Sequence, residues 1–177
     1  MSPVETVVAL LDQREPACGF CRVVGVDGPS GSGKTTFAGR LSDATDARVL
    51  HLENLYEGWH GLESAVPKAA QILAAVAVDE VGRAPGWDWE HDRPGPDVTL
   101  TPAPVIVVEG VGAAAAAIRP FLSVVVWVDG PEGERRRRAL MRDGDTYAPW
   151  WDVWAAQERR HFAREATRGH ADVVLDA

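Results

Sequence analysis

The sequence predicts an α/β fold, a three-layer sandwich in which a five-stranded parallel sheet carries helices on both faces. Five short runs are rich in Val and Ile without regular polar alternation, which is typical of strands buried on both faces. Segments of helical character separate these runs, and such alternation favours a parallel sheet. The first run leads into a glycine-rich turn, so we expect ligands beyond the carboxyl ends of the strands.

The expected elements follow one another along the chain. Residues 1–19 should contain a helix, because small apolar residues recur there at helical spacing. The strands are expected at residues 22–27, 47–52, 104–110, 122–130 and 171–176. Helices are expected at Lys34–Ser42, Ser64–Val81, Ala113–Ile118, Pro131–Met141 and Pro149–Thr167. The remaining long stretch, Gly82–Pro104, is rich in Pro and Gly but carries two Trp, which predicts an ordered functional loop.

Length, composition and charge restrict the class of protein. The 177 residues suit one domain, and 46% apolar with 25% charged residues is ordinary for a soluble globular chain. No stretch approaches the roughly 20 apolar residues of a membrane span, and the first residues lack the basic start of a signal peptide. We therefore expect a cytoplasmic protein without a membrane partner. A net charge of -8 argues against nucleic acid as a partner.

Cysteine and histidine give no sign of a metal or redox centre. Cys18 and Cys21 form a C-x-x-C pair, but the pair precedes a strand and lacks the second pair of ligands that zinc needs. Two ordinary thiols are the expected state. The five histidines are scattered without metal-ligand spacing.

The segment GPSGSGKT, from Gly28 to Thr35, fits the motif G-x-x-x-x-G-K-[ST] at every fixed position. It also lies between a predicted strand and a predicted helix, as the motif requires. Its glycines allow backbone N–H groups to turn inward around phosphate oxygens, and the helix N-terminus adds its positive dipole end. We therefore expect ATP phosphates to be bound by Gly28, Ser30, Gly31, Ser32, Gly33, Lys34, Thr35 and Thr36.

Three side chains near this loop have expected roles with Mg·ATP. Lys34 would reach the β- and γ-phosphates, and the Thr35 hydroxyl would hold Mg²⁺. Glu109 ends the apolar run VIVVE, which puts its carboxylate at the edge of the sheet beside the loop. Carboxylate oxygens suit Mg²⁺, so Glu109 is the expected second magnesium residue.

The residues after the second predicted strand favour a kinase acting on a small molecule. A switch GTPase would carry N-K-x-D for guanine, which the sequence lacks. A small-molecule kinase needs a carboxylate near the end of the second strand to orient or deprotonate the acceptor hydroxyl. The segment HLENLYEGW supplies Glu53, Tyr56 and Glu57 there. Glu53 is the expected base.

An arginine-rich segment supplies candidates for closing over the transferred group. Arg135, Arg138 and Arg142 share one helix face at i, i+3 and i+7, and a glycine-containing turn follows them. Residues 135–148 are therefore predicted to form a small lid, with Arg138 and Arg142 clamping the phosphoryl group. A solvated helix surface is the alternative for this charge run.

Five blocks together resemble the uridine kinase group of P-loop nucleoside kinases over residues 20–176. They read VDGPSGSGKTTFA, LENLYEGW, WDWEHD, VIVVEG and RALMRDGD. The resemblance implies a single P-loop NTPase domain over residues 1–177, with strand order 2-3-1-4-5. It also implies transfer of the ATP γ-phosphoryl group to a hydroxyl of a small molecule, most directly a nucleoside.

The acceptor residues carried over from this resemblance include two departures. The acceptor carboxylate of the family is usually Asp in D-x-x-Y, which maps onto Glu53 with Tyr56. Asp88 would bind the acceptor beside Trp89, where the family usually has Tyr-Asp-Phe in place of Trp-Asp-Trp. Glutamate adds one methylene, so either the acceptor sits differently or transfer is compromised, since about 1 Å of misplacement can cost about a hundredfold in rate.

Two other functions remain open from the sequence. One is a kinase for a nucleotide or another metabolite, such as a sugar or a pantothenate-like alcohol. The other is a nucleotide-binding regulator or slow NTPase, in which ATP closes residues 135–148 to present a surface to a partner.

Four aromatic residues near the C-terminal end recur near helical spacing and are expected to pack in the core or the lid: Trp150, Trp151, Trp154 and Phe162.

Overall fold

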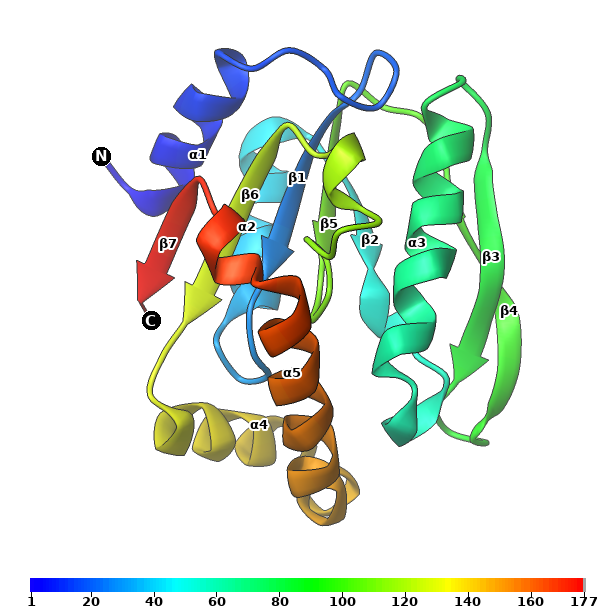
Figure 1. Cartoon of the computed structure of the whole chain (residues 1–177), viewed down its shortest axis with the longest axis vertical. Helices are drawn as coiled ribbons and strands as arrows, with labels where there is room; N and C mark the ends of the chain where they lie inside the picture. The colour runs from blue at the N-terminus through cyan, green and yellow to red at the C-terminus, as the bar shows by residue number, and fades with distance from the viewer. Residues whose placement is uncertain (177) are drawn as a thin grey trace.

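The computed structural model describes residues 1–176, and its main sheet has five parallel strands (Figure 1). These strands are β1 (Arg22–Asp27), β2 (Arg48–His51), β5 (Val105–Glu109), β6 (Val124–Asp129) and β7 (Val173–Asp176). Their order across the sheet is β2-β5-β1-β6-β7. Counted along these five strands the order is 2-3-1-4-5, so the predicted fold class and strand order are confirmed.

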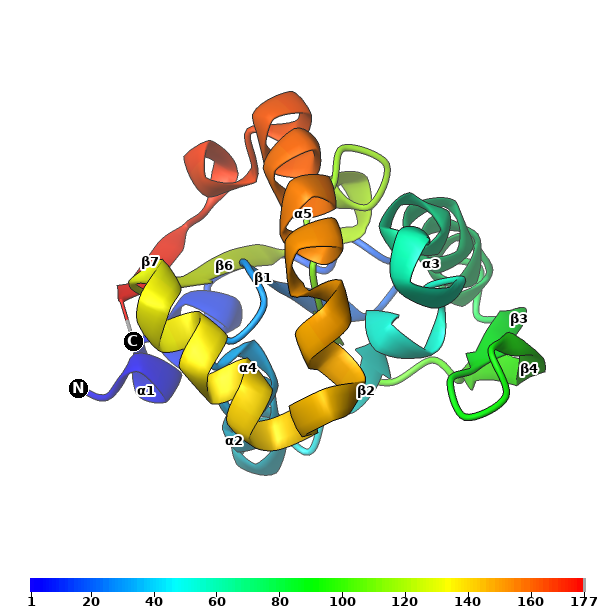
Figure 2. The ribbon, with the colours of Figure 1, turned by 90° about the horizontal axis from the view of Figure 1, so that it is seen from below.

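Helices cover both faces of this sheet. The helices are α1 (Pro3–Asp12), α2 (Lys34–Thr45), α3 (Leu62–Val76), α4 (Glu132–Tyr147) and α5 (Trp151–Glu165). One buried cluster joins α1 and α2 to the Val residues of β1, β5 and β6, and a second joins α3 and α5 to the opposite face. Figure 2, seen from below, shows α4 crossing in front of the edge where the strands end.

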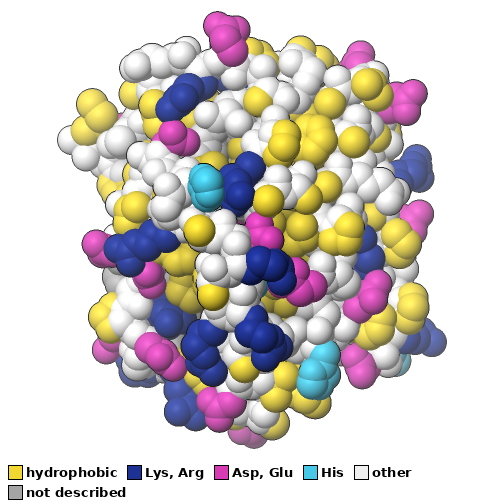
Figure 3. All heavy atoms as spheres, in the orientation of Figure 1, with side chains coloured by type: hydrophobic (Ala, Val, Ile, Leu, Met, Phe, Trp, Pro, Cys, Tyr) yellow, Lys and Arg dark blue, Asp and Glu magenta, His cyan; other side chains and the backbone are white. Residues whose placement is uncertain are grey.

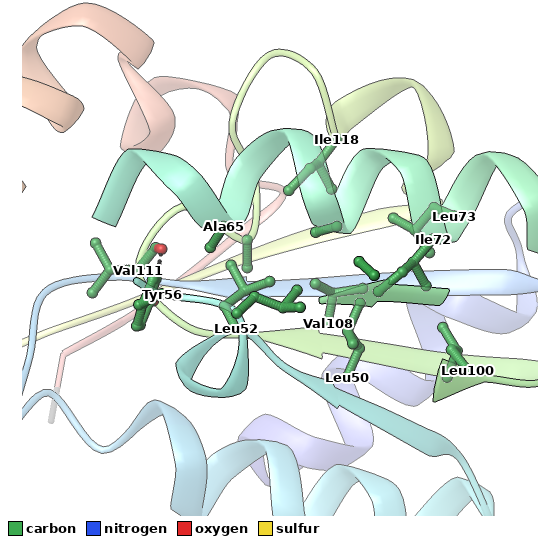
Figure 4. Packing of buried hydrophobic residues seen from close by; sticks show 14 of the residues in the cluster. Leu50, Leu52, Tyr56, Ala65, Ile72, Leu73, Leu100, Val108, Val111 and Ile118 are labelled. Carbon is green, nitrogen blue, oxygen red and sulfur yellow. Dashed lines mark hydrogen bonds between the residues drawn. The ribbon is translucent and has the colours of Figure 1, made fainter. Parts of the chain in front are cut away.

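The second cluster packs α3 against β2 and β5 (Figure 4). Ile72 and Leu73 of α3 pack toward Leu50 of β2 and Val108 of β5, and all four are buried. Burying such a side chain stabilises the fold by roughly 1.5–3 kcal/mol. The polar segment that follows β2 is therefore attached to a rigid core.

The segment Gly82–Pro104 is a β-hairpin, which corrects the prediction of a loop. β3 (Gly82–Asp88) pairs antiparallel with β4 (Arg93–Leu100) in a separate two-stranded sheet beside α3. Proline removes a ladder hydrogen bond and normally excludes a central strand, but each strand of a two-stranded sheet has a free edge. Pro85, Pro94 and Pro96 are tolerated for this reason.

The expected helix at Ala113–Ile118 is absent from the described chain, where turns lead to a 3₁₀ turn at Arg119–Phe121. The N–H groups of Ala113, Ala115 and Ile118 donate to carbonyl oxygens three residues earlier, so the segment forms successive turns instead of a helix. Distant carboxylates also bind it: Asp27 accepts from Gly112 and Ala114, and Glu165 accepts from Ala116. Tertiary context therefore overrides the helical propensity of the alanines.

The remaining helices differ from the prediction mainly at their ends. α1 is shorter than the span 1–19, α3 ends five residues before Val81, and α5 begins after a 3₁₀ turn at Ala148–Trp150. α4 continues through most of the expected lid, with a break at Gly144, whose φ of 53° and ψ of -131° are not helical. The arginines therefore lie on a helix, as expected, and the glycine-containing turn expected after them is a kink within that helix.

The surface is mixed in charge. Figure 3 shows Lys and Arg side chains gathered over the lower part of the face where α4 and α5 lie, with acidic side chains between them. Among residues 1–176, no helix is both long and apolar enough to cross a membrane.

Candidate functional site

The glycine-rich loop between β1 and α2 packs closely against its neighbours. Gly28 has a φ of 142°, and a Cβ there would lie 2.0 Å from the carbonyl oxygen of Val128 in β6. Gly31 has a φ of 76°, and a Cβ there would lie 2.1 Å from the carbonyl oxygen of Arg135 in α4. The loop therefore requires glycine at both positions, for conformation and for space.

Replacing Gly31 with alanine should lower the free energy of unfolding by about 2 kcal/mol or more, since it adds both strain and a clash. Gly39 in α2 is the matched control, because a Cβ there meets nothing within 4 Å. Gly39→Ala should raise stability by up to about 1 kcal/mol through helix propensity. Urea denaturation of the two variants checks this, and equal stability of Gly31→Ala and the parent would contradict the close packing of α4 on the loop.

Lys34 begins α2 and its amine turns back toward the loop. The side chain is buried, and Nζ donates a hydrogen bond of 2.9 Å to the carbonyl oxygen of Pro29. Burial lowers the pKa of Lys34, whereas the negative charges of Glu158, Glu109 and Asp27 oppose this shift. A cation in this setting can stabilise negative charge on a transferred phosphoryl group.

Asp27 at the end of β1 ties the loop to the turn after β5. It is fully buried and accepts hydrogen bonds from the backbone N–H groups of Gly28 at 2.7 Å, Gly112 at 3.0 Å and Ala114 at 2.9 Å. Burial raises the pKa of Asp27, and these three hydrogen bonds act in the opposite direction. Through these contacts Asp27 holds the glycine-rich loop against the turn that follows β5.

Thr35 and Glu109 lie together at the mouth of the loop. The Thr35 hydroxyl donates to Glu109 Oε2 at 3.3 Å, and His51 Nδ1 lies 2.7 Å from Glu109 Oε1. This hydrogen bond raises the pKa of His51. Two adjacent oxygen donors fit Mg²⁺. In residues 1–176 no group of three His, Cys, Asp or Glu could hold a metal, so phosphate and water oxygens would complete the coordination.

Glu53 and Tyr56 follow β2, in and just after the 3₁₀ turn Leu52–Asn54. Tyr56 is buried, and its hydroxyl donates to the carbonyl oxygen of Val111 at 2.9 Å, as the dashed line in Figure 4 marks. Trp89, from the hairpin turn, donates from Nε1 to the carbonyl oxygen of Glu53 at 2.9 Å. The backbone at Glu53 is thus held by the hairpin, and Glu53 lines the cavity described next.

A cavity of about 330 Å³ is lined both by the glycine-rich loop and by the segment that follows β2. Its lining includes most of the residues singled out in the sequence: Ser30, Gly31, Lys34, Thr35, Glu53, Tyr56, Trp89, Glu109 and Arg142. Arg142 makes two hydrogen bonds to Asp143 Oδ2, at 2.9 and 2.7 Å, which raise the pKa of Arg142. Ser32 does not line the cavity, but its buried hydroxyl has no hydrogen-bond partner within residues 1–176 and so can donate to a phosphate oxygen.

Asp88 and Arg138, two candidate residues from outside the phosphate loop, do not line this cavity. Asp88 closes the hairpin turn, with its carboxylate bonded to His91 Nδ1 at 2.8 Å and to the N–H groups of Glu90 and His91. Arg138 is half-buried on α4 and does not line the cavity. The remaining loop residues, Gly28, Gly33 and Thr36, shape the loop and the first turn of α2 rather than the cavity wall.

Several cavity residues were missed in the sequence. Trp59 and Tyr147 stack at 5.0 Å and form one aromatic wall, and Trp154 packs edge-on to Tyr56 at 4.8 Å. Such pairs arise from tertiary packing and leave no local pattern. His51 does not line the cavity but contacts Glu109, and it could have been found because it ends β2 opposite Glu109 on the neighbouring strand.

The aromatic residues of α5 pack as expected. Trp151 and Trp154 are buried, Trp150 stacks on Trp59 at 6.1 Å, and Phe162 lies edge-on to Trp127 at 4.7 Å. Trp154 additionally lines the cavity.

The chain is similar to curated kinases over most of its length. It is 26% identical to a uridine kinase of Borrelia hermsii over 87% of this chain and 85% of that protein. It is 31% identical to a shikimate kinase of Corynebacterium diphtheriae over 85% of each chain. No family model matches the chain.

Solved structures share the fold. A possible uridine kinase from Bacillus stearothermophilus has a TM-score of 0.65 at 24% identity, covering 98% of this chain and 95% of that one. A putative fructose transport system kinase from a Silicibacter species also has a TM-score of 0.65, at 18% identity over 97% and 96% of the two chains. With the phosphate loop and the sheet order, the sequence similarity to curated kinases shows that the chain is a phosphotransferase belonging to the P-loop kinases, a group that includes the uridine kinases it resembles.

Proposed function

We propose that the protein transfers the γ-phosphoryl group of Mg·ATP to a hydroxyl of a nucleoside. The observation that carries this proposal is the single cavity in which Lys34 of the phosphate loop and the carboxylate of Glu53 both take part. Phosphoryl transfer needs little covalent chemistry from the protein beyond positioning the two reactants and stabilising the developing charge. A phosphate loop at one side of a cavity and a carboxylate at the other meet this requirement.

The residues around the cavity have separate roles in the proposed phosphoryl transfer. Backbone N–H groups of the loop bind the phosphates, and Lys34 stabilises negative charge on the β- and γ-phosphate oxygens. Thr35 and Glu109 would hold Mg²⁺, which neutralises phosphate charge. Glu53 accepts the proton of the attacking hydroxyl. Arg142 would leave its pair with Asp143 and bind the transferred phosphoryl group, adding positive charge there. Arg138 lies outside the cavity lining, so it would contact this group only after a movement of α4.

The acceptor class follows from the lining of the cavity. Aromatic side chains, including Tyr56, Trp59 and Trp89, offer apolar surface for a ring-bearing acceptor. Within residues 1–176 the cations that line the cavity are Lys34 and Arg142, and Arg142 is paired with Asp143. This charge balance suits a neutral acceptor better than one that carries a phosphate or a carboxylate.

The similarity to a shikimate kinase makes a carboxylate-bearing alcohol the second candidate. Such an acceptor would pair its carboxylate with Arg142, which requires breaking the ion pair between Arg142 and Asp143.

We further propose the cytoplasm as the compartment, in keeping with the free thiols of Cys18 and Cys21.

Product analysis tests the proposal. The protein is incubated with Mg·ATP and, separately, uridine, cytidine, uridine monophosphate, shikimate, fructose and pantothenate, and the products are identified by mass spectrometry. A phosphorylated uridine or cytidine is the expected product. Phosphorylated shikimate or sugar alone would assign another acceptor class, and ATP binding without any product would favour a nucleotide-binding regulator or slow NTPase.

A further inference from the structure

Ser30, in the outer part of the phosphate loop, is held on both sides by the helices that follow β6. Its N–H donates to Glu158 Oε1 of α5 at 2.8 Å, and its carbonyl oxygen accepts from Arg135 Nη1 of α4 at 3.1 Å. Arg135 also donates from Nε to the carbonyl oxygen of Gly130 at 3.0 Å. Figure 2 shows the loop after β1 lying between α4 and α5. Neither Glu158 nor Arg135 is explained by the roles assigned above.

Glu158 is the unusual member of this arrangement, because it brings a carboxylate to a loop built to bind phosphate. Its side chain is only 4% exposed, so solvent and salt screen its charge weakly. Glu158 is also one of the negative charges, with Glu109 and Asp27, that oppose the lowering of the pKa of Lys34 by burial. In the nucleotide-free protein, Glu158 therefore supplies negative charge both to a loop N–H group and to the loop lysine.

We propose that Glu158 is a positioning residue that orders the nucleotide-free loop and sets its affinity for the nucleotide's terminal phosphate. The inference rests on the proposed binding of ATP phosphates by this loop. Because Lys34 reaches the β- and γ-phosphates, a buried negative charge beside Lys34 opposes each further negative charge placed there. Glu158 thus weakens the binding of ATP more than that of ADP.

Glu158→Gln is the variant that isolates this effect. Glutamine is close to glutamate in shape and keeps an oxygen that can accept from the Ser30 N–H, while the negative charge is removed. We expect the dissociation constant for ATP to fall about tenfold and that for ADP to fall less. Isothermal titration calorimetry of both nucleotides, at low and high salt, measures the two constants. The difference should persist at high salt, because the charge is buried.

Glu165→Gln is the matched control. Glu165 lies on the same helix and also accepts from a backbone N–H, that of Ala116 at 2.7 Å, but it does not contact the phosphate loop. Glu165→Gln should therefore leave the affinities for ATP and for ADP unchanged. Glu158→Ala, which removes the hydrogen bond as well as the charge, should lower the melting temperature relative to Glu158→Gln.

The outcomes separate the inference from the proposed function. If the parent protein binds no ATP, the proposed function fails. If the parent binds ATP and Glu158→Gln leaves the ATP and ADP affinities unchanged, or weakens both equally, only the role of Glu158 is overturned. A purely structural role would weaken both nucleotides together, whereas the proposed role predicts tighter binding and a larger change for ATP.

Discussion

Replacing Lys34 with alanine is expected to lower the rate of phosphoryl transfer by about a thousandfold or more. Lys34 is the buried cation of the phosphate loop, and removing one such electrostatic group from a transition state typically costs a hundred- to a thousandfold. The fold should persist, because the amine makes one hydrogen bond, to Pro29, within residues 1–176. Lys34→Met, which keeps the aliphatic stem, should give the same loss of activity with less disturbance of packing.

Arg40→Ala serves as the control for this experiment. Arg40 is an exposed cation on the same helix and does not line the cavity. Steady-state rates and circular dichroism are compared for the three variants. Retained turnover in both Lys34 variants, with Arg40→Ala also active, would remove the phosphate loop from the reaction.

Replacing Glu53 with glutamine is expected to lower kcat by about a hundredfold or more while ATP affinity changes little. The substitution removes the carboxylate that accepts the hydroxyl proton, and general-base groups typically contribute a hundred- to ten-thousandfold. Glu53 lines the cavity from the turn after β2, and the phosphate loop does not depend on it for its shape. Measuring kcat together with the dissociation constant for ATP distinguishes a base from a binding residue.

Glu57→Gln is the control for Glu53. Glu57 lies four residues further on but forms an ion pair with Lys68 at 2.8 Å and does not line the cavity. It should leave kcat within about twofold of the parent, as expected for a partly exposed ion pair. An unchanged kcat in Glu53→Gln would point to another carboxylate of the cavity, with Asp143 the first to test.

The phosphate-binding side of the site could be predicted from the sequence because its determinants are local. A strand, a glycine-rich turn and a helix follow one another between Arg22 and Thr45, and the motif specifies the turn. Glu109 could be placed beside the loop because parallel strands end at the same edge of a sheet. These are short-range rules, and they held for the five strands of the main sheet.

The acceptor side, and the contacts of α5 with the phosphate loop, could not be predicted as well, because both depend on contacts between distant segments. Glu158 lies 128 residues from Ser30 in the sequence, and no spacing rule links them. The hairpin was missed because its prolines obey edge-strand rules that require knowledge of the partner strand. Asp88, assigned from the family resemblance, closes a turn outside the cavity, whereas Trp59 and Tyr147 form an aromatic wall of the cavity.

The most direct test of the central claim is the rate of ADP release from Mg·ATP with and without uridine or cytidine, measured on the parent protein and on Lys34→Met. The account predicts that a nucleoside accelerates ADP release well above the acceptor-free rate, and that Lys34→Met abolishes both rates. An acceptor-free rate that neither nucleoside changes would contradict transfer to a nucleoside by this cavity.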